Sequence, residues 1–223
     1  MRWEDVPGWC DFDDIYEEAV QEFSSGSHFV EIGTFFGRSA LSMAAKIRDS
    51  GKQIRFDTID GVSLLQQAHS PDVNDEHRKA FDYAVSGDAE ASMQVIKDIA
   101  GVSTEQQAAF DKAMKSGHTI RHAFNHFVQG SGLGEYLNAV EAHDLDAVKN
   151  YPDASLDFFF LDAEHFYEST KASLLAWLPK MKPGSVFAGH DYTDNFPGVK
   201  QAVDEVLAGR DIVVRGSSYW LRI

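Results

Sequence analysis

The sequence contains a single cysteine, Cys10, among 223 residues. One cysteine excludes an internal disulfide and a cysteine-rich metal site, and it agrees with a reducing compartment. Apolar runs long enough to span a bilayer are also missing. The first residues, MRWEDVPGW, lack the charged-then-apolar order of a signal peptide. The sequence therefore predicts a cytoplasmic protein without a membrane partner.

Basic residues are scarce: 20 lysines and arginines stand against 35 aspartates and glutamates, so the formal net charge is −15. A surface that binds nucleic acid or an anionic membrane needs basic patches, and we therefore expect no nucleic-acid partner. Hydrophobic residues make up 43% of the chain, enough for one sizeable core. This favours a single domain over residues 1–223.

Short apolar runs alternate with helical patterns along most of the chain. Five runs have the length of strands and cover residues 28–32, 54–60, 136–142, 156–162 and 185–191. Residues Phe158 to Leu161 are all apolar, as in a strand covered on both faces. Apolar residues at helical spacing follow Gly37, precede a stop at Pro183–Gly184 and follow Pro197. The alternation predicts a three-layer α/β sheet with right-handed crossovers.

Three segments depart from this alternation. Residues 1–27 form a lead-in with one helical pattern. The C-terminal run DIVVRGSSYWLRI surrounds Gly216–Ser217 with β-rich stretches, which predicts a hairpin and an antiparallel last strand. Residues 62–134 are too long for a simple connection. Their helical patterns cover 75–85, 89–99, a segment opened by the cap STEQ at Ser103–Gln106, and about 120–128. We expect a helical insertion that is either decoration or a lid over the strand ends.

The stretch FVEIGTFFGRSALSMA joins the first predicted strand to a helix. In an open α/β sheet, ligands bind at the carboxyl ends of the strands. Gly33 and Gly37 allow the backbone to turn and to approach a ligand, and the amides at the helix start suit an anion. Glu31 and Asp60 stand at the ends of the first two strands, where acidic side chains accept hydrogen bonds from ribose hydroxyls. A nucleoside-containing ligand is expected, although the G-x-G-x-x-G dinucleotide fingerprint is missing.

Two further predicted strands end in the sequences LDAEHFY and GHDY. If these strands are neighbours, Asp162 and Asp191 lie close together, with His165 and His190 beside them. Such a group can bind a divalent cation that keeps an open position. Equally, Asp162 can cap the next helix and Asp191 can bind loop amides. The residues alone leave both interpretations open.

The stretch VEIGTFFGRSALSMA resembles the first motif of class I S-adenosylmethionine-dependent methyltransferases, in the branch of catechol O-methyltransferase. The stretches SLDFFFLDAEHFYESTKASLLAWLPKMKPGSVFAGHDY, FPGVKQAVDE and PGWCDFDDIYEEAV resemble methyltransferase family 24. Relatives of that family include macrocin-type sugar O-methyltransferases and cephalosporin hydroxylase-like proteins. The resemblance covers about residues 7–60 and 137–205. It implies a Rossmann-like sheet of seven strands with the last one antiparallel, and S-adenosylmethionine as the cofactor.

The resemblance also implies roles for single residues. The implied cofactor-binding residues are Glu31, Gly33 and Gly37 at the methionine and ribose end, Ser39 at the methionine carboxylate, Asp60 at the ribose hydroxyls and Asp144 beside the adenine. Asp162 and Asp191 match metal ligands of metal-dependent relatives, for which we expect Mg²⁺. The third ligand stays open, with His190 as our candidate. His165 stands three residues after Asp162, at the offset of a catalytic lysine or histidine in relatives, and is the expected general base.

The sequence therefore predicts an S-adenosylmethionine-dependent O-methyltransferase, assisted by Mg²⁺, that acts on a small hydroxylated molecule. The resemblance also makes a homo-oligomer possible. An alternative is a nicotinamide-dependent oxidoreductase on a Rossmann sheet, which the missing fingerprint and the terminal hairpin disfavour. A second alternative is a non-catalytic nucleoside-binding module, which the intact group of Asp162, His165 and Asp191 disfavours.

Overall fold

The structure is a computed structural model that describes residues 1–61, 97, 101–115 and 120–223. Its α-helices are α1 (Asp13–Glu22), α2 (Arg38–Ser50), α6 (Gln107–Lys115), α7 (Ile120–Ser131), α8 (Asp144–Ala147), α9 (Tyr167–Trp177) and α10 (Pro197–Val206). Its strands are β1 (His28–Ile32), β2 (Arg55–Ile59), β3 (Asn138–Val140), β4 (Leu156–Leu161), β5 (Met181–Gly189), β6 (Val213–Arg215) and β7 (Ser218–Arg222). Short 3-10 helices cover Trp3–Asp5, Gly134–Tyr136, Val148–Asn150 and Leu178–Lys180. Among the described residues, no helix is long and apolar enough to cross a membrane.

The strands form one seven-stranded sheet in the order β3-β2-β1-β4-β5-β7-β6. Strand β7 is antiparallel to both β5 and β6, and the other neighbouring pairs are parallel. The strand order reverses between β1 and β4, which pair at the centre with Phe29 opposite Phe158. The predicted Rossmann-like sheet with its antiparallel last strand is confirmed. Ligands of such sheets bind where the order reverses, at the carboxyl ends of β1 and β4.

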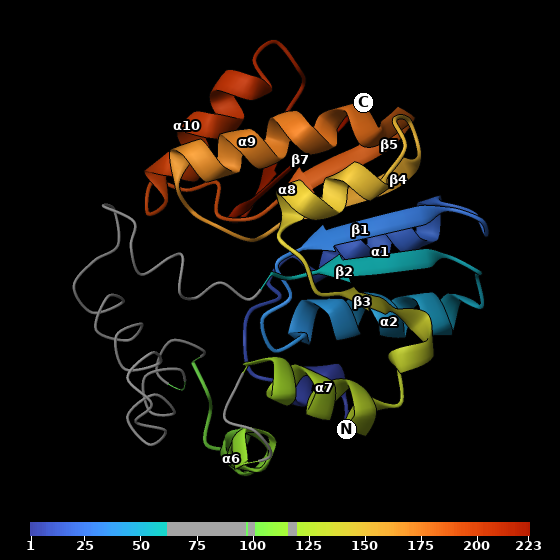
Figure 1. The fold of residues 1–223 in the computed structure, drawn as a ribbon, viewed down its shortest axis with the longest axis vertical. Helices are drawn as coiled ribbons and strands as arrows, with labels where there is room; N and C mark the ends of the chain where they lie inside the picture. The colour runs from blue at the N-terminus through green and yellow to red at the C-terminus, as the bar shows by residue number, and fades with distance from the viewer. Residues whose placement is uncertain (62–96, 98–100, 116–119) are drawn as a thin grey trace. The chain divides into compact units, whose positions relative to one another are not determined.

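Two apolar clusters lie on opposite faces of the sheet (Figure 1). Helices α8, α9 and α10 cover one face, and α1 and α2 cover the other. Consecutive residues of β4 alternate between the clusters: Phe158 and Phe160 face α1 and α2, whereas Phe159 and Leu161 face the other helices. Burial of each such phenylalanine contributes about 1.5–3 kcal/mol. The apolar run in β4 is thus covered on both faces, as its lack of alternation predicts.

Strand β5 begins earlier than the sequence predicts. The expected helix stop at Pro183–Gly184 lies inside the strand, and helix α9 already ends at Trp177. The pairing with β4 is irregular here, because Leu156 pairs with Met181 and Phe158 pairs with Val186. Proline has no N–H to donate to the neighbouring strand, so Pro183 and Gly184 lie in a bulge of β5. Regular pairing with β4 resumes after this bulge.

The chain forms two compact units. Unit 1 consists of Met1–Trp9, Phe35–Arg38 and Val62–Gly132, and unit 2 consists of Cys10–Thr34, Ser39–Gly61 and Leu133–Ile223. Unit 2 therefore carries all seven strands of the sheet.

Within unit 1, α6 and α7 pack around Phe36. Its ring centroid lies 5.6 Å from that of Phe110 and 6.3 Å from that of Phe127. The predicted cap precedes α6: Ser103 N–H donates to Gln106 Oε1 at 3.0 Å, and Gln106 N–H donates to Ser103 Oγ at 3.3 Å. This reciprocal pair is the capping box that the letters STEQ predict. The helices expected over 75–85 and 89–99 lie outside the described residues, apart from residue 97.

Candidate active site

The carboxyl ends of β1, β2 and β4 meet through their backbones. Gly33 N–H donates to the carbonyl of Ile59 at 2.9 Å, and Asp162 N–H donates to that of Ile32 at 2.8 Å. Gly33 has φ of 96°, and a Cβ at this position would lie 1.6 Å from the carbonyl oxygen of Asp162. Only glycine permits this approach. Gly33 therefore brings the loop after β1 against the end of β4.

Glu31 lies at the end of β1, only 1% exposed, and is held by hydroxyl groups. Its carboxylate accepts hydrogen bonds from Tyr16 Oη at 2.8 Å and from Thr58 Oγ1 at 2.6 Å, and Ser39 also bonds to it. Burial raises the pKa of Glu31 to about 7, against the hydrogen bonds from Ser39, Thr58 and Tyr16 that favour the charged form. Two predicted cofactor residues, Glu31 and Ser39, thus lie together.

Asp60 follows β2 and anchors the neighbouring loop. Its Oδ2 accepts a hydrogen bond from the backbone N–H of Thr34 at 2.9 Å. The backbone of Gly61 packs against the residue before α8, since a Cβ on Gly61 would lie 3.0 Å from the Cα of His143. The buried Asp144 follows His143 and accepts a hydrogen bond from Ser173 Oγ at 2.6 Å. The structure therefore places Asp60 and Asp144 along the same row of strand ends as Glu31 and Gly33.

Gly37 belongs to unit 1, unlike the other predicted cofactor residues. Its φ is 92°, and a Cβ on this residue would lie 2.8 Å from the ring of Phe124 in α7. Close packing against that ring explains the glycine within unit 1. The expectation that Gly37 lines a cofactor stays a prediction.

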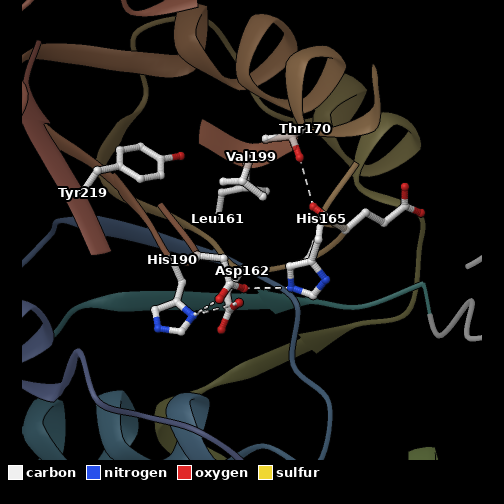
Figure 2. A pocket seen from close by; sticks show the side chains of 10 residues that line it. Leu161, Asp162, His165, Thr170, His190, Val199 and Tyr219 are labelled. Atoms are coloured by element: carbon white, nitrogen blue, oxygen red, sulfur yellow. Dashed lines mark hydrogen bonds and ion pairs between the residues drawn. The ribbon is translucent and has the colours of Figure 1, made fainter. Parts of the chain in front are cut away.

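Four side chains converge beyond β4 and β5. His165 Nε2 lies 2.7 Å from Asp191 Oδ2, and His190 Nδ1 lies 3.2 Å from Asp191 Oδ1. His190 Nδ1 also lies 3.6 Å from Asp162 Oδ1. Figure 2 shows the two imidazole rings facing the carboxylate groups between them. Ligand atoms of Asp162, His165 and Asp191 lie within 4.8 Å of one another. The predicted approach of Asp162 and Asp191 is thus found, since β4 and β5 are parallel neighbours.

The charges of this cluster shift the pKa of its members. Burial lowers the pKa of His190, but hydrogen bonds to Asp162 and Asp191 outweigh it and raise the pKa to about 11. Burial likewise lowers the pKa of His165, and its bond to Asp191 reverses this into a net rise. The pKa of Asp191 lies well below its ordinary range, because the bonds from both histidines outweigh the effect of burial. Without a bound cation, protons on the imidazoles therefore balance the two carboxylates.

Asp191 has a backbone conformation that side chains rarely adopt. Its φ is 60°, in the left-handed region. The surrounding backbone holds this turn: His190 N–H donates to the carbonyl of Leu161 at 3.0 Å, and Tyr192 N–H donates to that of Ser217 at 2.8 Å. Aspartate tolerates this region better than most residues, and such conformations cluster at functional sites. The fold therefore imposes the position of the Asp191 carboxylate.

The structure adds residues that the sequence did not indicate. Asp11 Oδ1 lies 2.9 Å and Ser217 Oγ 2.8 Å from His190 Nε2, and the ring of Phe12 packs on that imidazole at a centroid distance of 4.9 Å. Glu164 lines a pocket together with the cluster. All three are exposed or half-buried polar residues outside regular elements, for which no periodic signal exists: Asp11 and Ser217 lie in turns and Glu164 in the loop after β4.

Comparison with known proteins gives the family. The sequence profile of a methyltransferase domain, that of methyltransferase family 24, matches residues 30–192, most of the chain. A segment of 46 residues is 39% identical to the uncharacterized protein y4gI of Sinorhizobium fredii. That match spans 21% of this chain and only 5% of the other protein.

Solved structures share the fold. The chain is similar to the O-methyltransferase NovP, with a TM-score of 0.59 and 18% identity over 95% of this chain and 78% of that one. It is similar to a putative caffeoyl-CoA O-methyltransferase from Staphylococcus aureus, with a TM-score of 0.56 and 12% identity over 99% of this chain and 87% of that one. For CalS11, a TDP-rhamnose 3'-O-methyltransferase, the TM-score is 0.53 and the identity 18% over 95% and 76%. The match to the family and the shared fold agree, and the chain belongs to methyltransferase family 24, among the class I S-adenosylmethionine-dependent methyltransferases.

Proposed function

We propose that this chain transfers a methyl group from S-adenosylmethionine to a hydroxyl of a small acceptor, with the help of a bound divalent cation. The observation that supports this most is the convergence of Asp162, His165, His190 and Asp191 beside the loop after β1. The family accounts for methyl transfer, and the cluster offers groups that can deprotonate a hydroxyl. The activities named for NovP and CalS11 agree with an oxygen acceptor.

The cofactor is proposed to lie along the carboxyl ends of β1, β2 and β3. Asp60 is assigned to the ribose hydroxyls, Ser39 to the methionine carboxylate and Asp144 to the adenine. Glu31 and Gly33 shape this edge, Glu31 through its hydroxyl network and Gly33 through its approach to Asp162. When bound, S-adenosylmethionine supplies an electrophilic methyl carbon, whose bond to sulfur breaks as the bond to the acceptor oxygen forms.

His165 is the proposed general base. A cation bound to Asp162 and Asp191 would offset the negative charge that raises the pKa of His165, and so favour its neutral ring. In that ring Asp191 accepts the hydrogen on Nε2 at 2.7 Å, which leaves Nδ1 to take a proton from the acceptor hydroxyl. Figure 2 shows the second nitrogen of the His165 ring on the side away from the carboxylate groups. The His165 side chain is 37% exposed, against 10% for His190, so an acceptor can reach it more easily. Asp191 orients this ring and stabilises the imidazolium that forms.

Asp162, Asp191 and His190 are the proposed ligands of the cation. Their side chains meet without an intervening apolar residue, and their donor atoms are carboxylate oxygens and an imidazole nitrogen. A divalent cation held there would lower the pKa of a coordinated hydroxyl and stabilise its oxyanion. These ligands also fix where the acceptor oxygen lies, and alignment is the main requirement of an in-line displacement.

The test is calorimetric titration with S-adenosylmethionine and S-adenosylhomocysteine, followed by turnover with catechols, sugars and sugar nucleotides as acceptors. We expect one-to-one micromolar binding of both cofactor forms and release of S-adenosylhomocysteine with at least one acceptor. His165→Ala should keep the binding and slow the transfer by about 10²- to 10⁴-fold, because the base is lost. His122→Ala, which removes an exposed histidine of α7, is the matched control.

Absence of cofactor binding would contradict the proposal, and NAD would then be titrated. Binding without turnover of any acceptor would favour a nucleoside-binding module instead. A normal transfer rate in His165→Ala would refute only the role of His165 as the general base.

A further inference from the structure

His190 has hydrogen-bonding partners on both sides of its ring. On the outer side, Nε2 lies 2.9 Å from Asp11 Oδ1 and 2.8 Å from Ser217 Oγ. The Ser217 hydroxyl donates its hydrogen to Asp11 Oδ2 at 2.8 Å. The Asp11 carboxylate has no hydrogen to donate, and the hydroxyl hydrogen of Ser217 already points to Asp11. Both neighbours of Nε2 can therefore only accept a hydrogen bond from it. The arrangement requires the ring hydrogen on Nε2.

On the inner side, His190 Nδ1 faces Asp191 Oδ1 at 3.2 Å and Asp162 Oδ1 at 3.6 Å. With its hydrogen on Nε2, a neutral ring directs a lone pair at two anionic oxygens. The His190 and Asp191 side chains are only 10% and 12% exposed, so water screens this repulsion poorly. A positive species must lie among these three atoms. In the metal-free cluster described above a proton on Nδ1 takes this place, and a bound metal ion would replace it.

We infer that the ion that replaces this proton is a first-row transition ion, of which Zn²⁺ and Co²⁺ are representatives, rather than Mg²⁺. This inference rests on the cation assistance in the proposed function and names the ion class. Mg²⁺ prefers oxygen ligands, whereas an imidazole nitrogen next to carboxylates suits zinc, cobalt, iron and nickel. Two ligand atoms that are each ~2.1 Å from such an ion lie about 3.0–3.4 Å apart in octahedral or tetrahedral arrangements. The separation of 3.2 Å between His190 Nδ1 and Asp191 Oδ1 lies in this range, and the 3.6 Å to Asp162 Oδ1 is slightly longer.

Asp11 is the positioning residue in this inference. A metal-binding histidine commonly donates its other ring hydrogen to a carboxylate, which fixes the ring and makes the bound nitrogen a better donor. Asp11 stands in that place, and the Phe12 ring 4.9 Å away limits rotation of the imidazole. His165 also lies near both carboxylates. We assign His190 because its outer nitrogen is held by Asp11 and its side chain is the more buried of the two.

The inference is tested by metal binding to the full chain after chelator treatment, with CoCl₂, ZnCl₂ and MgCl₂ in calorimetry and equilibrium dialysis. We expect one Co²⁺ or Zn²⁺ per chain, bound at least about 100-fold more tightly than Mg²⁺. The visible absorption of bound Co²⁺ gives a readout that does not depend on activity. Equal or tighter binding of Mg²⁺, or no binding of any of the three ions, would overturn the inference.

Variants locate the ligand. His190→Asn replaces the nitrogen donor by an amide oxygen, and it should weaken Co²⁺ and Zn²⁺ binding by at least about 10-fold while Mg²⁺ binding changes little. Asp11→Ala should weaken Co²⁺ binding by about 10- to 100-fold, and Asp11→Asn should retain more of it because its amide oxygen still accepts the Nε2 hydrogen. His122→Ala is the control for nonspecific binding to a surface imidazole. If His165→Ala abolishes Co²⁺ binding and His190→Asn does not, the assignment of His190 is wrong.

Titration of the same samples with S-adenosylmethionine separates the two proposals. Cofactor binding without any metal binding would overturn the inference and the cation assistance in the proposed function, and it would leave methyl transfer by His165 intact. Selective Co²⁺ or Zn²⁺ binding without cofactor binding would support the inference and contradict the proposed function.

Discussion

Gly33 shows how one missing side chain determines the geometry of the site. The residue does more than turn the chain, because the carbonyl of Asp162 occupies the space of its absent Cβ. Gly26 provides a natural comparison in the same unit. Its φ of 94° nearly equals the 96° of Gly33, but a Cβ added to Gly26 would meet no other segment of the described chain within 4 Å. The two glycines therefore separate the cost of the backbone conformation from the cost of the collision.

Gly33→Ala should be much more destabilising than Gly26→Ala. Both variants force a Cβ onto a positive φ, which costs about 1–2 kcal/mol. Gly33→Ala must also displace the backbone of Asp162, and we expect a further loss of at least about 2 kcal/mol in the free energy of unfolding. Urea denaturation of both variants measures the difference. Equal losses would mean that the two strand ends separate without cost.

Glu31 is a buried acid whose charge is disfavoured by the fold. Burial raises its pKa to about 7 from an ordinary value of 4.5. Between these values the folded state keeps the proton that the unfolded state has lost. The free energy of unfolding therefore falls as the pH rises through this window, by about 1.4 kcal/mol per pH unit.

Glu31→Gln removes this titration. The stability of the wild type relative to Glu31→Gln should fall by about 3 kcal/mol between pH 4.5 and pH 8. Chemical denaturation across that range provides the measurement. Glu22→Gln is the control: the hydrogen bond from Arg222 lowers the pKa of Glu22, so its contribution is lost only as the pH falls below about 4.5 and stays nearly constant in this range. A constant difference between wild type and Glu31→Gln would contradict the raised pKa of Glu31.

At the scale of the elements, Asp57 connects three strands and the segment before β4. This fully buried residue of β2 accepts hydrogen bonds from His28 of β1 at 2.8 Å, Asn138 of β3 at 3.0 Å and Tyr151 at 2.9 Å, and Arg55 also donates to it. Burial would raise its pKa, but these bonds lower it well below the ordinary range. The parallel strands at this edge are thus joined by side chains as well as by backbone.

Asp57→Asn should cost about 3 kcal/mol in the free energy of unfolding. An amide has one acceptor atom in place of two and no charge, so donors from neighbouring strands lose their partner in a buried place. Asp146→Asn is the control: Asp146 pairs with Lys149 at 2.6 Å, but both side chains are more than 70% exposed. That change should cost less than ~0.5 kcal/mol. Similar losses in both variants would show that the strands do not depend on Asp57.

For the whole molecule, the sequence predicted the architecture well because the architecture follows from periodicity. The unbroken apolar run at Phe158–Leu161 identified a central strand, and the two β-rich stretches around Gly216–Ser217 identified the hairpin. The residues of the site that stand at strand ends, such as Asp162 and Asp191, were predictable for the same reason. Neighbouring parallel strands place their carboxyl ends together.

The rest depends on contacts between segments far apart in sequence. Asp11 lies in a turn before α1, and only the folded chain brings it to His190 and Ser217. The sequence also did not indicate that the absent Cβ of Gly33 makes room for the backbone of Asp162. The helix stop predicted at Pro183–Gly184 was wrong, because a bulge lets strand β5 accommodate residues that usually end an element.

The central position of β1 has a consequence for how the protein is made. Its partner β4 is synthesised late, because His28 and its hydrogen-bonding partner Asp157 are separated by 129 positions. At a ribosome's pace of roughly 5–20 residues per second, β1 waits about 6–26 seconds for that neighbour. During this time the apolar side chains of Phe29 and Val30, buried in the finished sheet, have one of their two flanking strands missing. During this interval the edge of β1 that later pairs with β4 is open, and chaperones that bind exposed strand edges can bind the nascent chain there.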